Sequence, residues 1–159
     1  MLLNCHTYYS FGYGTLSLEQ LLDEALRQGH SQFVLSDINN TSACIDMVRL
    51  AGDRGIKPIL GIDFRNGIKQ CYVGIARNNA GFKELNEHLS EHLHQTKNFE
   101  EQAPEFTNAY VVYPSQYYTG WALRENEFVG VSLKELQRLP FLPIRHQENK
   151  LVALQPVTF

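Results

Sequence analysis

Short apolar runs alternate with amphipathic segments along the first half of the chain. Three of the runs have the length and composition of buried β-strands: residues 2–5, 33–35 and 59–64. Between the first two, Ser17 with Gln20 forms a capping box that predicts a helix, and Gly29 ends it. Between the second and third, a helix is expected to begin at the N-caps offered by residues 39–41 and to stop at Gly55. Two strand–helix–strand units in succession predict a parallel α/β sheet with right-handed crossovers.

The inner faces of two helices follow from the spacing of their apolar residues. The helix before Gly55 is expected to bury Cys44, Met47, Val48 and Ala51. A later helix, capped by Asn78 or Asn79, is expected to bury Phe82, Leu85, Leu89 and Leu93.

The second half of the chain has a weaker pattern. Asn66-Gly67 stands between two apolar runs and predicts a hairpin that leads into a strand at 71–76. Further strands are expected at residues 109–112, 127–130 and 151–154, and a short helix between Ser132 and Leu139. We expect a single domain over residues 1–159, with the final strand standing part-way through a larger fold.

Composition excludes several classes of protein. With 43% hydrophobic and 19% charged residues, the 159-residue chain is expected to be globular, and no apolar stretch approaches the roughly 20 residues of a membrane helix. A net charge of -3 without a Lys/Arg cluster disfavours a free-standing nucleic-acid binder. The three scattered cysteines are expected to be reduced thiols in the cytoplasm.

Candidate chemistry gathers where the first three strands end. His6, Asp37 and Asp63 follow or finish buried runs, and the carboxyl ends of parallel strands meet at one edge of a sheet. These three side chains could ligate a cation, whereas Asn4 and Ile38 stand where further ligands would help. Each of the three also has a structural interpretation: His6 as a hydrogen-bonded buried residue, Asp37 as a helix-start carboxylate and Asp63 as a solvated acid.

Several motifs together resemble one family. His6-Thr7-Tyr8-Tyr9-Ser10 is similar to the end of the family's H-x-H strand and the S-x-Y-S type of loop that follows it. Ser36-Asp37-Ile38-Asn39-Asn40 is similar to T-D-H-G-N, and residues 55–63 to G-I-K-P-I-I-G-x-E. The chain resembles the PHP domain at the amino terminus of bacterial DNA polymerase III α subunits. The resemblance implies an irregular (β/α)7-type barrel, truncated here after a late strand, whose intact members bind up to three Zn, Mn or Fe ions.

Carried over position by position, the resemblance implies a vestigial metal site. Three potential ligands remain: His6, Asp37 and Asp63, the last in place of a glutamate. The other positions carry different residues: Asn4, Ile38 and Cys71 in place of histidines, Tyr13 in place of a loop acid, and Pro156 and Thr158 in place of the final Asp and His. Too few donors remain for a cluster of divalent cations, so no catalytic residue and no bound metal are expected.

The resemblance also implies a setting. The chain is expected to be the PHP region of a replicative polymerase subunit, acting as a scaffold for the rest of that subunit and for other replicase subunits. DNA would be bound by the full-length protein, whose palm domain, absent here, would use Mg for nucleotide transfer. One alternative is a metal-dependent proofreading exonuclease or phosphoesterase that holds Zn or Mn at a residual site of His6, Asp37 and Asp63. Another is a free-standing PHP-like regulatory binding protein.

Three further histidines, His88, His92 and His94, lie on the helix that begins near Asn79, together with Glu87 and Glu91. His88 and His92 are four positions apart, but the H-E-x-x-H order of zinc proteases is absent and Leu85, Leu89 and Leu93 occupy another face. We therefore interpret these histidines as part of a solvated helix face rather than as a zinc site.

Overall fold

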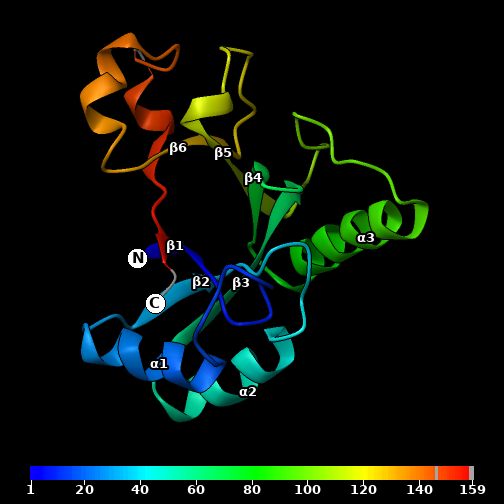
Figure 1. Ribbon diagram of the computed structural model, residues 1–159, viewed down its shortest axis with the longest axis vertical. Coiled ribbons are helices and arrows are strands. Elements are labelled where there is room, and N and C mark those ends of the chain that lie inside the picture. Colours follow the sequence, from blue (N-terminus) through cyan, green and yellow to red (C-terminus); the bar gives the residue numbers. More distant parts are fainter. Residues whose placement is uncertain (146, 158–159) are drawn as a thin grey trace.

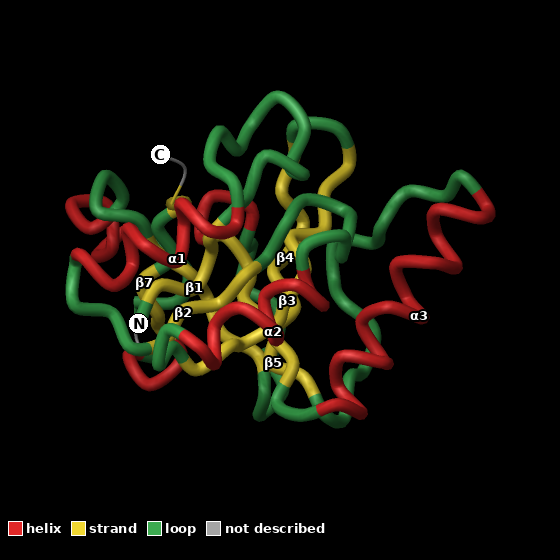
Figure 2. The backbone as a smooth tube through the Cα atoms, turned by 90° about the horizontal axis from the view of Figure 1, so that it is seen from below, coloured by secondary structure: helices red, strands yellow, loops and turns green. Residues whose placement is uncertain are grey.

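The structure is a computed structural model that describes residues 1–145 and 147–157. Its strands are β1 (Leu2–Cys5), β2 (Gln32–Leu35), β3 (Lys57–Asn66), β4 (Lys69–Ala76), β5 (Ala109–Pro114), β6 (Glu127–Val131), β7 (Leu151–Ala153) and β8 (Pro156–Val157). Its α-helices are α1 (Leu18–Arg27), α2 (Cys44–Asp53) and α3 (Asn79–Gln95), and short 3-10 helices span Ser115–Tyr117, Leu136–Phe141 and Glu148–Lys150. The helices surround a central group of strands, with α3 to one side (Figure 2).

All eight strands form one mixed sheet in the order β7-β6-β5-β4-β3-β2-β1-β8. β1, β2 and β3 are parallel, the β3–β4 and β4–β5 pairs are antiparallel, and β5, β6 and β7 are again parallel. The carboxyl-terminal segment touches both edges of this curled sheet, because β7 pairs with β6 and β8 pairs with β1 (Figure 1). The mixed α/β, barrel-type fold predicted from the sequence is therefore confirmed.

The first two strand–helix units match the pattern closely. Ser17 and Gln20 form the expected capping box, with Gln20 N donating to Ser17 Oγ at 3.3 Å and Ser17 N donating to Gln20 Oε1 at 2.9 Å. The hairpin at Asn66-Gly67 joins β3 to β4, as predicted. A first apolar cluster packs α1 and α2 against the sheet through buried residues that include Leu22, Phe33 and Met47.

Two details of α2 differ from the sequence prediction. The helix begins at Cys44, and its N-cap Ala43 makes no side-chain capping bond, so residues 39–41 do not cap it. Asn39 Nδ2 instead donates to Arg65 O of β3, and Asn40 Nδ2 donates to Tyr9 O in the loop after β1. Val48 is 54% exposed, so the buried face is Cys44, Met47 and Ala51.

The inner face of α3 also differs from the prediction, since Leu93 is exposed and His92 is buried. His92 stacks on Phe99, with ring centroids 4.8 Å apart, and Phe99 belongs to the loop that returns from α3 to β5. The prediction of a solvated histidine face is therefore wrong for His88 and His92. It holds for His94, which is exposed.

The prediction of a short helix after Ser132 was close. Ser132 N donates to Glu135 Oε2 at 2.8 Å, as a capping pair would, but the segment that follows is a 3-10 helix containing Pro140. A proline inside a helix removes one backbone donor and favours a short, tight turn.

No described helix has the length and apolar character needed to cross a membrane.

Gly81 provides a first test of this fold. A Cβ added there would lie 1.9 Å from the carbonyl oxygen of Asn108, because α3 begins directly against the loop before β5. Helix propensity alone favours alanine by about 1 kcal/mol, but we expect Gly81→Ala to lower the free energy of unfolding by about 1–3 kcal/mol through this clash.

The matched control is Gly52→Ala in α2, where an added Cβ meets nothing within 4 Å. That substitution is expected to raise the free energy of unfolding by up to about 1 kcal/mol. Urea unfolding of both variants measures the difference, and equal effects would contradict the close approach at Asn108.

Candidate functional site

Asp37 is the first polar centre at the carboxyl end of the sheet. It follows β2 and is 2% exposed. Its Oδ1 accepts hydrogen bonds from Thr7 N at 2.7 Å and Ser10 Oγ at 2.6 Å, and its Oδ2 accepts one from Thr7 Oγ1 at 2.7 Å. The carboxylate therefore holds the loop between β1 and α1, as a backbone-bound carboxylate does in a turn.

A second polar centre joins β1 to β3. His6 Nε2 lies 3.0 Å from Asp63 Oδ2, and both side chains are fully buried. The Arg65 guanidinium donates to the same Oδ2 from Nε at 3.0 Å and from Nη2 at 2.7 Å. Tyr13 covers this group: the Arg65 guanidinium lies 4.5 Å from its ring centroid, and the His6 ring meets it edge-on at 4.9 Å.

Asn39 fixes the position of Arg65 through the backbone. Asn39 Oδ1 accepts from Arg65 N at 2.9 Å, and Asn39 Nδ2 donates to Arg65 O at 2.8 Å. Asn39 N also donates to Asp63 O at 3.0 Å. Asn39 has φ of 50°, a left-handed conformation that asparagine tolerates better than most residues. The turn after β2 therefore places the guanidinium beside Asp63.

The electrostatics of this centre favour a charged Arg65. Burial lowers the pKa of the guanidinium, but the hydrogen bonds and charge of Asp63 raise it, and the net effect is a raised pKa. The Asp63 carboxylate is buried and has Arg65 as its cationic partner. A buried carboxylate needs such a partner, because an isolated charge in a protein interior is very costly.

These residues do not fit the metal cluster of intact family members. A cation at Asp63 Oδ2 would have to displace Arg65, which already neutralises the carboxylate, and both oxygens of Asp37 are occupied by three donors. Among the described residues, the buried atoms without a hydrogen-bond partner here are Asn4 Nδ2, His6 Nδ1 and Asp63 Oδ1. Asn4 Nδ2 is only a donor, so two potential ligand atoms remain, fewer than a catalytic zinc usually takes.

The other predicted positions divide between the site and the core. Asn4 is buried at the end of β1, where its Oδ1 accepts from Ser36 Oγ at 3.0 Å. It pairs with Pro156 of β8, so these two are brought together as expected. Ile38 forms an isolated parallel bridge with Asp63 and is partly exposed.

Of the remaining two positions, Cys71 adds no ligand to the site. Cys71 belongs to the apolar cluster that contains Phe64, and burial raises the pKa of its thiol. A protonated thiol is a poor metal ligand. Thr158 lies outside the described residues.

Sequence reasoning missed Arg65, although a signal for it existed. Asp63 and Arg65 are two positions apart on β3, and residues at this spacing point to the same face of a strand. The signal is weak, because Arg65 directly precedes the Asn66-Gly67 turn and could equally be a solvated turn residue. The exposed aromatic loop residues Tyr8, Tyr9 and Phe11 lie outside this centre, whereas Tyr13 covers it.

The fold and this site define a barrel-type α/β domain with polar side chains gathered at its strand ends. The chain belongs to the PHP domain family, whose family model matches residues 3–131. Over 83 residues it is 32% identical to the DNA polymerase III subunit alpha of Ureaplasma parvum. That match covers 52% of this chain and 8% of the relative, so the chain spans a small part of that protein's length.

Two solved structures are more distant. A Bifidobacterium adolescentis protein proposed to be a metal-dependent phosphoesterase has a TM-score of 0.46 at 20% identity, over 59% of this chain and 32% of that one. A Chromobacterium violaceum amidohydrolase, with sulfate and no metal, has a TM-score of 0.41 at 22% identity, over 59% of this chain and 36% of its own. At TM-scores below 0.5 neither likeness bears on activity.

Proposed function

We propose that this PHP domain is a structural part of a DNA polymerase III α subunit and does not hydrolyse phosphoesters at its strand ends. The observation that carries the proposal is the Arg65 guanidinium bound to Asp63 Oδ2 at 2.7 Å and 3.0 Å. The charged Arg65 side chain then neutralises the Asp63 carboxylate, as a bound metal ion would, but it cannot activate water. It offers no open coordination position at which water could become a nucleophile.

The second support is the hydrogen bonding of Asp37. Its carboxylate closes the loop after β1 instead of facing an open pocket. Asp37 and Arg65 thus keep the architecture of the strand ends, with side-chain bonds in place of metal–ligand bonds. In a larger polymerase subunit such a domain would serve as a rigid body against which other domains and replicase subunits pack.

The 32% sequence identity to a DNA polymerase III subunit alpha over 83 residues supports the proposal that this domain is part of a replicative polymerase. In that setting the full-length protein would synthesise DNA in the cytoplasm, using a Mg-dependent palm domain outside residues 1–159. The 159-residue chain alone is then expected to incorporate no nucleotide on a primed template. In the full-length polymerase, His6→Gln is expected to leave nucleotide incorporation unchanged.

Hydrolysis assays test the absence of a phosphoesterase centre. We expect no hydrolysis of bis-p-nitrophenyl phosphate and no 3′–5′ degradation of single-stranded DNA in the presence of Zn, Mn or Mg. The active-site control is His6→Gln, measured beside the wild-type chain at equal concentration. Metal-dependent hydrolysis by the wild-type chain that His6→Gln abolishes would overturn the proposal and favour an enzyme with an altered ligand set.

A further inference from the structure

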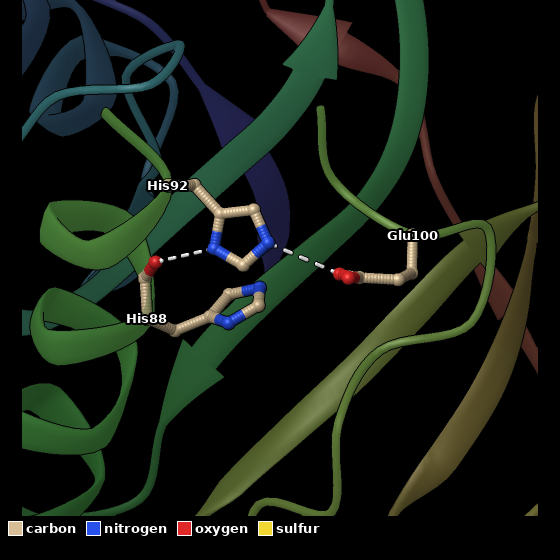
Figure 3. Close-up of side chains that lie close together, drawn as sticks. All are labelled: His88, His92 and Glu100. Atoms are coloured by element: carbon tan, nitrogen blue, oxygen red, sulfur yellow. Dashed lines mark hydrogen bonds and ion pairs between the residues drawn. The ribbon is translucent and has the colours of Figure 1, made fainter. Parts of the chain in front are cut away.

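A second group of potential ligands lies on the last turns of α3 and in the loop that follows it. His88 and His92 project from successive turns of the helix, and Glu100 approaches them from the loop that follows (Figure 3). One ligand atom from each of the three lies within 4.8 Å of the others. His92 is 5% exposed, His88 is partly buried and Glu100 is exposed.

The hydrogen bonds of His92 orient its ring toward the glutamate. His92 Nδ1 lies 2.9 Å from the carbonyl oxygen of His88, to which only a protonated nitrogen can donate. In the neutral ring, the lone pair then resides on Nε2, which faces Glu100 Oε2 at 3.1 Å. Two acceptors that face each other need either a proton or a metal ion between them, and a metal ion would satisfy both when the His92 ring is neutral. A backbone carbonyl bound to the other ring nitrogen is the usual outer support of a metal-ligating histidine.

His88 is held by a neighbouring side chain, through the other ring nitrogen. Its Nε2 lies 2.7 Å from the Tyr72 hydroxyl, and its ring centroid is 4.3 Å from that of His92. Phe64 and Phe106 meet the His88 ring at 5.3 Å and 5.5 Å. These aromatic walls restrict both imidazoles and lower the local dielectric, which strengthens electrostatic interactions inside the group.

We propose that His88, His92 and Glu100 bind one divalent transition-metal ion, with zinc as the ion of best fit. Two imidazoles and one carboxylate are a ligand set that zinc accepts in four-coordinate sites. The ion would join the end of α3 to the loop that carries Phe99, so its role is structural. This site shares no residue with the centre at His6 and Asp63.

The charged residues around this group should influence its affinity for zinc. Lys97 Nζ binds Glu100 Oε1 at 2.7 Å, so an ammonium competes with the metal for the carboxylate. Removing that ammonium in Lys97→Met frees Oε1 and is expected to tighten zinc binding several-fold. A surface ion pair of this kind contributes little to folding, so the variant should fold normally.

The test is a titration of the metal-free wild-type chain with Zn²⁺. Binding is measured by calorimetry and by the rise in melting temperature. We expect one ion per chain, with an affinity that falls at least about tenfold in both His92→Gln and Glu100→Gln. The matched controls are His94→Gln and Glu91→Gln. These two residues are of the same types as His92 and Glu100, and both are exposed on α3, so the control variants should bind zinc as the wild type does.

Glu100→Gln keeps the test decisive if His92→Gln fails to fold, because Glu100 is an exposed loop residue. X-ray absorption of the zinc-loaded chain should show two imidazole ligands. The proposal is overturned if no saturable zinc binding occurs, if His92→Gln and Glu100→Gln bind as tightly as their controls, or if His6→Gln abolishes binding instead.

Discussion

Replacing Arg65 by methionine is expected to lower the free energy of unfolding by about 3–5 kcal/mol. Arg65 is 9% exposed, and its guanidinium makes two hydrogen bonds to the fully buried carboxylate of Asp63. Methionine has a similar length but no charge, so Asp63 would be left as a buried anion without its cationic partner. Urea unfolding at neutral pH, followed by circular dichroism, measures the loss.

Two further variants separate the lost charge from lost packing. Adding Asp63→Asn to the Arg65→Met chain removes the stranded charge while keeping a hydrogen-bonding group near His6, and should restore most of the stability. Arg49→Met is the surface control, because the Arg49–Asp46 pair is exposed and is expected to contribute less than about 1 kcal/mol. If Arg65→Met costs no more than Arg49→Met, Arg65 does not act as the counter-charge of Asp63.

Local patterns in the sequence were sufficient for much of the fold. The capping box of α1, the strands around Phe33 and Ile59 and the Asn66-Gly67 hairpin all depend on residues close together in the chain. The start of α2 was not predictable in this way. Asn39 had the chemistry of an N-cap, but its side chain is hydrogen-bonded to the backbone of Arg65. Arg65 lies close to Asn39 only because β2 pairs with β3.

The prediction of the buried face of α3 failed for the same physical reason. Helical spacing predicted that Leu93 is buried. His92 is buried instead, because Phe99 stacks on it from the following loop. A sequence pattern does not show which face a distant loop will cover.

At the candidate site, the sequence identified the residues but not their partners. His6, Asp37 and Asp63 do lie at or near the strand ends, as the order of strands required. They do not converge on one point, however: His6 and Asp63 share a hydrogen bond, while Asp37 binds Thr7 and Ser10. Counting missing ligands predicted a vestigial metal site, and this stays a prediction. The structure shows an arginine from the same strand paired with Asp63.

The second large effect is expected at Asp37, where Asp37→Ala should lower the free energy of unfolding by about 4 kcal/mol. The substitution leaves three buried donors, Thr7 N, Thr7 Oγ1 and Ser10 Oγ, without their acceptor. Each unsatisfied buried donor costs about 1–3 kcal/mol, and these bonds are strengthened by the negative charge. Urea unfolding gives the global loss, and hydrogen exchange at the Thr7 amide reports the local one.

Asp37→Asn distinguishes the hydrogen bonds from the charge, because the amide oxygen can still accept from Thr7 N and Ser10 Oγ. We expect it to cost roughly half as much as Asp37→Ala, since the bonds that remain are neutral ones. Asp53→Ala, at an exposed position near the end of α2, should change stability by no more than about 0.5 kcal/mol. Unchanged protection of the Thr7 amide in Asp37→Ala would show that this carboxylate does not hold the loop after β1, and the hydrogen-bonded scaffold at the strand ends would then lose its main support.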